Sequence, residues 1–498
     1  MEKYIKLVKP LVIAVIVVMI IIAALPACSS KNTDGNNNAV NESDVNNSGE
    51  NGANGAGSTE ATDSLPNDLN FNGAAVNLYI QEDSWKQEEF VADGETGDVI
   101  NDAVYRRNTA VEGRLNVKLN VITGPGWAKW DAMATQIRKS IMAGDHSYDL
   151  IAGWSARVPA LALDDLFMDL YQMPYLEPAQ PWWNQSMLTE MMLGGKLPFL
   201  CGDMTMSMIS NCSVVYFNKS VQKDYSAPDL YQAVADGKWT LDYMYALTKD
   251  ISKDLNGDGV MDAKDLYGIV LEPLNTADGF MQSSHIQMIT DNAAGIPQLN
   301  IEQEKLSNLI GKVYGLYYEN PGAYVMPDQS KFSDLFKNNQ ILLMPGRLSD
   351  AVVLRDMESD YGIIPYPKYD ETQTDYYSRI WDALSLMCVP MNCDKTEAVG
   401  AFMEAMGSES YKTVTPAYFD IALKAKYTRD DISSQMLDIV RSGAYLNFAS
   451  IYNESIGSPW FCLRNLMQAK KKDFASWYEK NEPIISGKID AIVSKLQG

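Results

Sequence analysis

The chain contains one loop whose residue types and spacing suit a metal ion. Oxygen-bearing side chains occur at positions 1, 3, 5, 9 and 12 of the run 254–265, and glycine stands at position 6, where a sharp turn is needed. Position 7 would contribute its backbone carbonyl. Oxygen ligands at this spacing are what Ca²⁺ prefers in protein loops. The predicted ligands are Asp254, Asn256, Asp258, Val260, Asp262 and Asp265.

This loop departs from the usual calcium pattern at one position. Position 12 is Asp265 instead of glutamate, and its shorter side chain makes a bidentate contact harder to form. In this respect the loop resembles the dockerin variant more than a signalling EF-hand. The alternative is an acidic, glycine-rich turn that holds no ion. We predict a structural Ca²⁺ cofactor that stabilises the fold and takes no part in an active site.

Tryptophans are the second set of residues with a chemical use, because an indole ring can stack on a ligand. The chain has 10 Trp and 27 Tyr. Trp85, Trp127 and Trp154 each follow a short run with strand character. Taken singly, Trp85 and Trp127 are more simply loop residues that pack on the protein. Trp154 directly follows Gly153 at its strand end, which favours a ligand contact.

Composition excludes several other functions. The 41 basic and 64 acidic residues give a net charge of −23, so we expect no nucleic acid partner. The only two histidines, His146 and His285, lie far apart in the sequence. This excludes a multi-histidine zinc site and gives little basis for Ser-His-Asp or Cys-His catalysis.

The elements that would position the tryptophans alternate between strand and helix patterns. Apolar residues alternate over 75–80 and again over 115–121, and a third strand is predicted at 149–152. Helical spacing connects them over 100–111 and 130–141. This β-α-β-α-β order predicts an α/β fold with a parallel sheet, in which ligands bind beyond the carboxyl ends of the strands.

The amino terminus has the pattern of a secretory signal. Three lysines precede an almost continuous apolar run over 11–25, which is short for a membrane span. The following Leu-Pro-Ala-Cys resembles the lipobox of bacterial lipoproteins, which implies cleavage after residue 27 and acylation of Cys28, with palmitate among the expected fatty acids. Residues 1–27 are therefore predicted to be the signal peptide. An uncleaved anchor helix is the alternative.

Residues 28–68 are predicted to be the lipidated cysteine and a disordered tether, because 29–64 contain no Leu, Ile, Met or aromatic residue. The protein would then sit at the outer face of the cytoplasmic membrane. The remaining cysteines are odd in number and have no CxxC spacing, so we expect no metal site among them. Either Cys388/Cys393 and Cys201/Cys212 form disulfides, or these residues and Cys462 are small buried thiols.

Motifs over the rest of the chain resemble the extracellular solute-binding proteins of bacterial ABC importers, especially the carbohydrate-binding, maltose-type group. The order of the motifs carries the resemblance more than any one of them. They are YDLIAGW (148–154), GKLP (195–198), VVYFNK (214–219), DGKWTL (236–241), YGIIPYPK (361–368), SESYK (408–412) and TPAY (415–418).

The resemblance implies a two-lobed, periplasmic-binding-protein-like α/β fold with hinge-crossing segments. One lobe would comprise 69–200 plus 364–420, and the other 205–362 plus 425–498. A solute would bind in the cleft between them, and hinge closure would present it to an ABC permease. The lipid bilayer would be a further partner through Cys28, and the protein is expected to be a monomer.

The same resemblance implies that the sugar is stacked between Trp154 of the first lobe and Trp460 of the second. Aromatic platforms and directional polar groups are what a pyranose needs, because it has C–H faces and a rim of hydroxyls. For the other candidates, ligand contact and packing remain open alternatives. These are Arg347, Asp203, Trp381, Asp382, Trp182 and Trp183. Trp85 is a further candidate, for which packing is favoured as stated above.

The leading hypothesis is a lipid-anchored oligosaccharide receptor without enzymatic activity. A receptor for a peptide or another small solute is the alternative within the same fold. A surface glycosidase working with two carboxylates is a third hypothesis, from a different class. A surface adhesin with this fold is the fourth. The sequence does not identify the sugar or the permease.

Overall fold

The first of two large sheets forms from the strands predicted near the start of the folded chain. The computed structural model describes residues 61–291, 296–419 and 431–497. Strand order in this sheet is β13-β3-β1-β2, and β1 pairs in parallel with both β2 and β3. The predicted β-α-β-α-β order and parallel pairing are confirmed. The strands are β1 (Ala74–Gln81), β2 (Val117–Gly124), β3 (Leu150–Trp154) and β13 (Ser385–Cys388).

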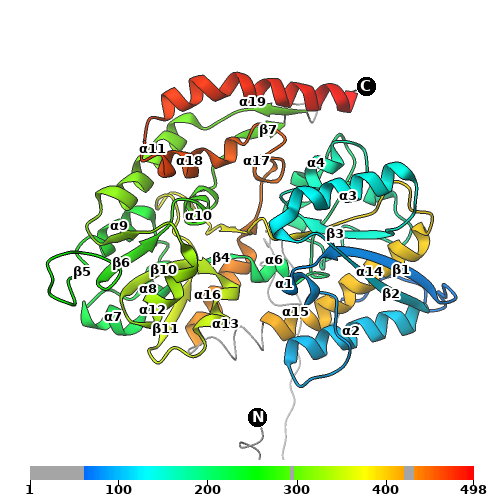
Figure 1. Ribbon diagram of the computed structural model, residues 1–498, viewed down its shortest axis with the longest axis horizontal. Coiled ribbons are helices and arrows are strands. Elements are labelled where there is room, and N and C mark those ends of the chain that lie inside the picture. Colours follow the sequence, from blue (N-terminus) through cyan, green and yellow to red (C-terminus); the bar gives the residue numbers. More distant parts are fainter. Residues whose placement is uncertain (1–60, 292–295, 420–430, 498) are drawn as a thin grey trace, which may run out of the picture. The chain divides into compact units, whose positions relative to one another are not determined.

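Helices lie on both sides of the first sheet, α3 and α4 on one side and α2 and α14 on the other (Figure 1). Helix α2 begins where the Asp98 carboxylate accepts hydrogen bonds from the amides of Ile100 and Asn101. Helix α3 ends at Gly144, whose φ of 63° suits glycine. The helices of this lobe are α1 (Ser84–Gln87), α2 (Val99–Leu115), α3 (Trp130–Ala143), α4 (Val158–Ala162), α5 (Leu188–Met191), α14 (Thr396–Lys412) and α15 (Val414–Pro416).

The second sheet has the order β11-β4-β10-β6-β5, and β9 pairs with β6. It is mixed, because β10 is parallel to β6 and antiparallel to β4. Every residue of β4 and β6 is buried, which explains their continuous apolar sequences. The strands are β4 (Ser213–Asn218), β5 (Ser252–Lys253), β6 (Leu266–Leu271), β9 (Ala323–Val325), β10 (Ile341–Arg347) and β11 (Tyr361–Ile364).

Helices pack around the second sheet to complete the second lobe (Figure 1). They are α7 (Lys219–Asp224), α8 (Leu230–Ala235), α9 (Leu241–Thr248), α10 (Asn275–Ser283), α11 (Gln303–Tyr314), α12 (Phe332–Lys337), α13 (Ala351–Leu354), α16 (Asp431–Ser442) and α18 (Cys462–Gln468). Among the residues that the structure describes, no helix has both the length and the apolar character that crossing a membrane requires.

Several segments run between the lobes. The short parallel pair β12 (Ser378–Arg379) and β14 (Ala444–Tyr445) lies among them, as do α6 (Ser207–Ser210) and α17 (Phe448–Ile451). Residues 365–379 contact the second lobe, since Trp239 Nε1 donates to the carbonyl of Pro365. Helix α17 packs on α5 of the first lobe, and the Tyr452 hydroxyl donates to the carbonyl of Met191. These segments, expected in the first lobe (364–379) and in the second (448–452), thus each contact the other lobe, and the lobe boundaries stay a prediction.

The last helix, α19 (Phe474–Gln497), contacts both lobes. It packs against α11 and β8 (Pro297–Leu299), which pairs antiparallel with β7 (Ile289–Asp291). Near its end, Lys495 pairs with Asp164 of the first lobe at 3.4 Å. In Figure 1 this helix runs along the top of the view from the second lobe toward α4.

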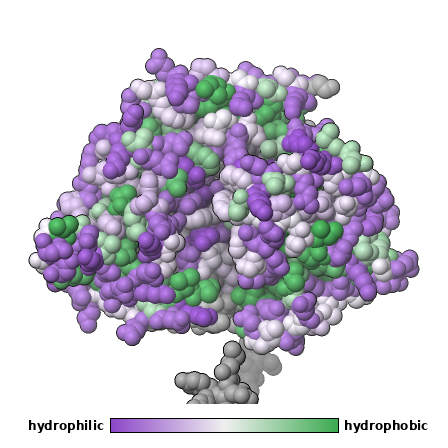
Figure 2. Space-filling model, in the orientation of Figure 1, coloured by the Kyte–Doolittle hydropathy of each residue, from purple (hydrophilic) through white to green (hydrophobic). Residues whose placement is uncertain are grey.

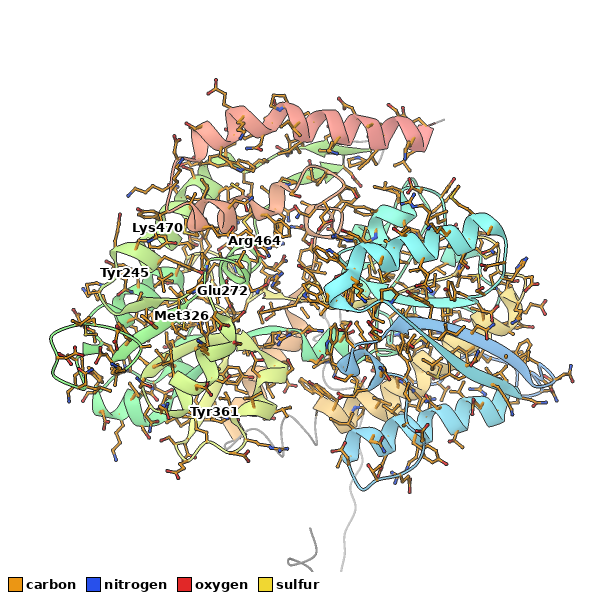
Figure 3. All side chains as sticks on the ribbon, viewed as in Figure 1. Tyr245, Glu272, Met326, Tyr361, Arg464 and Lys470 are labelled. Atoms are coloured by element: carbon orange, nitrogen blue, oxygen red, sulfur yellow. The ribbon has the colours of Figure 1, made fainter. Side chains whose placement is uncertain are left out.

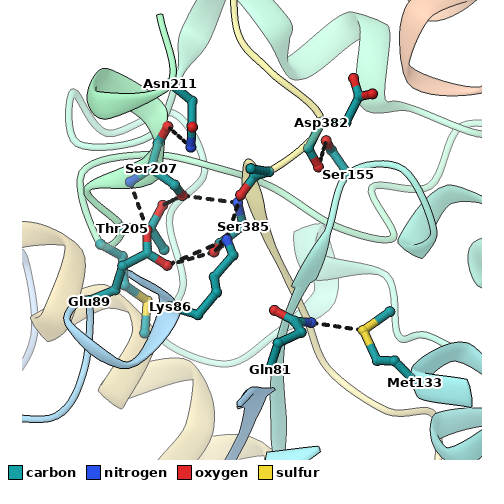
Figure 4. A network of polar contacts seen from close by, with 12 residues as sticks. Gln81, Lys86, Glu89, Met133, Ser155, Thr205, Ser207, Asn211, Asp382 and Ser385 are labelled. Carbon is teal, nitrogen blue, oxygen red and sulfur yellow. Dashed lines mark hydrogen bonds and ion pairs between the residues drawn. The ribbon is translucent and has the colours of Figure 1, made fainter. Parts of the chain in front are cut away.

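A buried ion pair in α1 and the turn after it fixes two of the crossing segments (Figure 4). Lys86 and Glu89 each expose about 1% of their surface, and their charged atoms lie 3.7 Å apart. Lys86 Nζ donates to the carbonyl of Ala383 at 2.6 Å and also to the Ser385 hydroxyl. Burial lowers the pKa of Lys86, and the neighbouring Glu89 opposes this shift.

The Glu89 carboxylate is fully used in the same network. It accepts from the amide of Ser207 at 2.7 Å and from the Ser385 hydroxyl at 2.7 Å. Ser385 in turn donates its amide to the Ser207 hydroxyl at 3.0 Å. The crossing segments around residues 207 and 385 are therefore bonded to each other and to the same ion pair of the first lobe.

We expect Lys86→Met to destabilise the protein by about 3–5 kcal/mol, because it leaves a buried carboxylate without its cation. The free energy of unfolding in urea measures this. Lys472→Met is the matched control, since Lys472 and its partner Glu319 are more than half exposed. The control should cost less than about 1 kcal/mol. Equal unfolding midpoints for the two variants would contradict the assigned role of the network.

Candidate functional site

Three tryptophans meet at the carboxyl ends of the parallel strands. The rings of Trp85 and Trp154 stack with an interplanar angle of 8° and centroids 6.2 Å apart. Trp127 meets Trp154 edge-on at 5.0 Å. Trp154 itself is fully buried, whereas Trp85 is 39% and Trp127 47% exposed. The rings available to a ligand are thus those of Trp85 and Trp127, for which the sequence favoured packing. Trp154 is buried and contacts both of them.

The loops after β1 and β2 are tied together by one carboxylate. Both oxygens of the Asp83 carboxylate accept a hydrogen bond from the backbone amide of Trp127, and the shorter of the two N–O distances is 3.0 Å. A Cβ on Gly126 would lie 2.9 Å from the same carboxylate, so glycine allows this close approach. The two exposed rings are therefore held on a fixed pair of loops.

Arg157 connects this region to the last crossing segment. Its guanidinium lies 3.6 Å from the ring centroid of Trp130 and pairs with Asp131 at 3.1 Å. It also forms a close ion pair with Glu454. Arg157 and Glu454 could not be identified from the sequence, because they meet only when residues far apart in the chain are brought together.

A small pocket lies beside this ion pair, between the lobes. Ser155 and Ala156, which directly follow Trp154, contribute to one wall, and Trp460 lines the pocket together with Phe461. The cavity is about 40 Å³, enough for a few waters but far below the roughly 300–1,000 Å³ of a small-molecule site. A sugar can enter only if the walls move apart.

A network of arginines and carboxylates reaches the wall of this pocket. Arg379 pairs with Asp382 at 3.0 Å and with the fully buried Asp278 at 3.3 Å. Arg464 Nε donates to Asp278 at 2.8 Å, and its guanidinium lies over the Phe461 ring at 3.8 Å. Arg379 and Asp382 of this network line the pocket and give it directional polar groups.

Burial shifts the pKa of two groups near this network in ways that favour their neutral forms. It lowers the pKa of Arg464 to about 10, an effect that Glu272 opposes. It also raises the pKa of Glu272, although backbone amides around Thr276 and the charge of Arg464 oppose the shift. Both side chains are labelled in the second lobe in Figure 3.

Arg347 and Trp381, predicted separately, are brought together. The Arg347 guanidinium lies 4.6 Å from the Trp381 ring centroid, and that of Arg379 lies at 5.2 Å. The indole Nε1 donates to the Ser213 hydroxyl at 3.0 Å. A pocket of about 320 Å³ beside Arg347 and Trp381 is large enough for a small ligand. Arg347 also pairs with Asp350 at 3.5 Å.

Trp182 and Trp183 lie in the core of the first lobe, with at most 1% of their surface exposed. Trp183 Nε1 donates to Glu404 of α14 at 3.3 Å, and a Cβ on Gly407 would lie 2.5 Å from the Trp182 ring. Of the two alternatives for this pair, the structure favours packing, and ligand contact stays untested. Close packing on α14 explains both residues, and burial raises the pKa of Glu404 to about 7.

Asp203 lies at the first crossing, as expected, but lines neither of these two pockets. It accepts a hydrogen bond from the Thr415 hydroxyl at 2.9 Å and lies 3.7 Å from Arg441 of the second lobe. Burial raises the pKa of Asp203 to about 6, and both neighbours oppose this shift. Through these two contacts Asp203 links α15 to α16.

The acidic loop over 254–265 uses its carboxylates on its own backbone. The Asp254 carboxylate accepts hydrogen bonds from the backbone amides of Gly257 and Gly259. The Asp265 carboxylate accepts hydrogen bonds from the backbone amides of Leu255 and Asp262. These amides lower the pKa of Asp265. Within the described ranges, no group of three or more His, Cys, Asp or Glu side chains is placed to hold a metal. Calcium binding stays a prediction.

The five cysteines after Cys28 are all buried and free. The suggested pairs Cys388/Cys393 and Cys201/Cys212 are not formed, and packing as small apolar residues explains their positions. Burial raises the pKa of the Cys212 thiol to about 12, so the thiol form is favoured.

The chain belongs to the family described as bacterial extracellular solute-binding protein, whose model matches residues 112–415, more than half of the sequence. No curated protein sequence matches it. Solved structures do match this chain. A cyclo/maltodextrin-binding protein in complex with maltotetraose is similar at a TM-score of 0.53 and 10% identity, covering 85% of this chain and 97% of that one.

A second similar structure is the GacH receptor of Streptomyces glaucescens, described unliganded and in complex with acarbose. Its TM-score is 0.53 at 10% identity, and the match covers 85% of this chain and 99% of that receptor. At this identity the likeness establishes the fold. The expected two-lobed α/β binding-protein fold is confirmed.

The raised pKa of Asp203 predicts that the free energy of unfolding depends on pH. Its folded pKa of about 6 lies above its ordinary 3.8, so between these values the folded state binds more protons than the unfolded state. The contribution of the protonated Asp203 carboxyl to stability is complete below about pH 3.8 and is lost as the pH rises through about 6. Asp203→Asn should therefore flatten the free energy of unfolding over this window. Parallel wild-type and variant curves from urea titrations at pH 4 to 8 would refute the assignment.

The calcium prediction is tested by thermal unfolding in CaCl₂ and in EDTA. With a Kd near about 10⁻⁴ M, about 1 mM Ca²⁺ stabilises the fold by roughly 1.4 kcal/mol. We expect EDTA to lower the melting temperature modestly and Asp258→Ala to abolish the difference. Asp224→Asn, an exposed change outside the loop, is the control. Identical melting in both solutions would show a loop that binds no ion.

Proposed function

We propose that this protein is a cell-surface receptor that binds an oligosaccharide between its lobes and passes it to an ABC importer. The observation that carries the proposal is the meeting of aromatic rings and charged hydrogen-bonding groups where the lobes face each other. Trp460, Arg379 and Asp382 line one pocket. The exposed Trp127 ring is linked to this pocket through Trp130 and Arg157, which pairs with the pocket residue Glu454. Pyranose rings need both kinds of partner.

The family and the two similar structures support this proposal. The family is one of solute-binding proteins, and the two structures are named as complexes with maltotetraose and with acarbose. Hydrophilic residues cover much of the face shown in Figure 2, including the region between the lobes, as expected for a receptor of a polar solute. Binding and hinge closure account for the arrangement without covalent chemistry.

The pocket carboxylates favour binding over glycoside hydrolysis. A glycosidase needs one carboxyl group that donates a proton and another that stays ionised. Here Asp382 is bonded to Arg379, and Glu454 to Arg157. Carboxylates arranged in this way can accept hydrogen bonds from sugar hydroxyls, as binding requires.

We further propose a lipid anchor on Cys28, which lies outside the described residues together with the predicted signal and most of the tether. The support is the sequence alone. Two acyl chains give stable attachment to a bilayer, whereas one gives only marginal attachment. Labelling of the wild type by palmitate in bacterial cells, and its loss in Cys28→Ser, would support acylation at this position.

Isothermal titration against a panel of oligosaccharides tests the receptor function. Trp460→Ala should weaken binding at least tenfold, about 1.4 kcal/mol, because it removes an aromatic wall of the pocket. Tyr171→Ala, which removes a half-exposed aromatic ring elsewhere on the first lobe, should bind as the wild type does. A wild-type protein that binds no sugar in the panel would remove the carbohydrate assignment.

A further inference from the structure

We infer that Trp85 and Trp127 form a stacking surface for one or more additional sugar units outside the pocket between the lobes, so that the ligand is a neutral pyranose chain longer than a disaccharide. This inference rests on the proposed function and specifies its substrate. The two rings are called the indole platform below.

The indole platform is an exposed aromatic surface that core packing does not require. Trp130, on the following helix, is covered by Arg157, and Trp154 is fully buried. Trp85 and Trp127 instead keep 39% and 47% of their surfaces exposed. Two large exposed rings that both contact Trp154 mark a binding surface more than they stabilise a fold.

The platform is rigid before any ligand arrives. Trp154 contacts both rings from beneath, and the Asp83 carboxylate bonds the Trp127 backbone from the neighbouring loop. The Lys86–Glu89 ion pair fixes the helix that carries Trp85. A preorganised surface loses little side-chain entropy on binding, which raises the affinity that stacking can provide.

The platform is linked to the pocket between the lobes by a row of side-chain contacts. The Trp127 ring meets that of Trp130 at 5.1 Å, Arg157 covers Trp130, and the partner of Arg157, Glu454, lines the pocket. A chain with one end between the lobes can therefore extend over the indoles. A monosaccharide held by Trp460 and Arg379 would leave the platform uncovered.

The surroundings of the platform favour a neutral carbohydrate over other occupants. Asp83 lies between the two loops, and Asp131, whose side chain is 82% exposed, follows Trp130. Carboxylates accept hydrogen bonds from hydroxyls and disfavour an acyl chain. Because Arg157 pairs with Asp131 and Lys86 Nζ lies 5.1 Å from the Trp85 ring centroid, the discrimination against an anionic sugar comes from the net charge of −23 of the chain as a whole.

The test is titration of the full chain in detergent with oligosaccharides of graded length. The probes are disaccharides and hexasaccharides prepared from starch, cellulose, xylan and β-mannan. For the glycan that binds, we expect the wild type to prefer the hexasaccharide at least fivefold. Trp127→Ala and Trp85→Ala should reduce this ratio to near one, while Tyr171→Ala keeps it. Thermal unfolding checks that each variant is folded.

The outcomes separate the inference from the proposed function. Equal wild-type affinities for the two lengths, or an unchanged ratio in both tryptophan variants, would overturn the indole platform and leave the receptor function standing. No binding of any glycan at either length would overturn the receptor function and the platform together.

Discussion

The buried Lys86–Glu89 pair is the interaction on which the relative placement of the functional parts depends. Two charges without solvent are costly unless every remaining donor and acceptor is satisfied. Here the satisfying groups are Ala383, Ser385 and Ser207, which belong to two different crossing segments. The energetic demand of the ion pair therefore orders the crossing segments against the first lobe. Because Trp85 is the residue before Lys86, the same interaction also places one ring of the platform.

Lobe movement has to occur around these fixed points. The last crossing contains two successive residues with left-handed backbone, Gly457 at φ 89° and Ser458 at φ 61°. Pro459 follows, with a restricted φ of its own. Glycine adopts this conformation without steric cost, whereas Ser458 and Pro459 have fewer alternatives. The cavity of about 40 Å³ beside Trp460 must enlarge for any sugar, and this turn is one place where the change can be absorbed.

Local pattern predicted the first sheet because alternation and helical spacing report which faces are buried. The strands at β1 and β3 and the helix end at Gly144 agree with the sequence. The exposure of Trp85, Trp127 and Trp154 could not be predicted, since it depends on how three loops close over one another. Trp182 and Trp183 share this difficulty, because only the approach of α14 at Gly407 makes them core residues. Arg379, Asp278 and Arg464 are far apart in sequence, and no spacing relates them.

The two sides of the site differ in a way that sets the order of binding. The first lobe presents exposed indoles that are already fixed, whereas Trp460 is only 3% exposed and Arg379 is held by two carboxylates. A sugar can therefore stack on the platform while the pocket between the lobes is still too small to admit it. Binding at Trp460 and Arg379 becomes available only as the walls separate and close again around the chain. The ligand shifts the population toward the closed form to the extent that these later contacts exceed the cost of opening. In this scheme the first lobe determines which chains are captured, and the second determines which of them are enclosed.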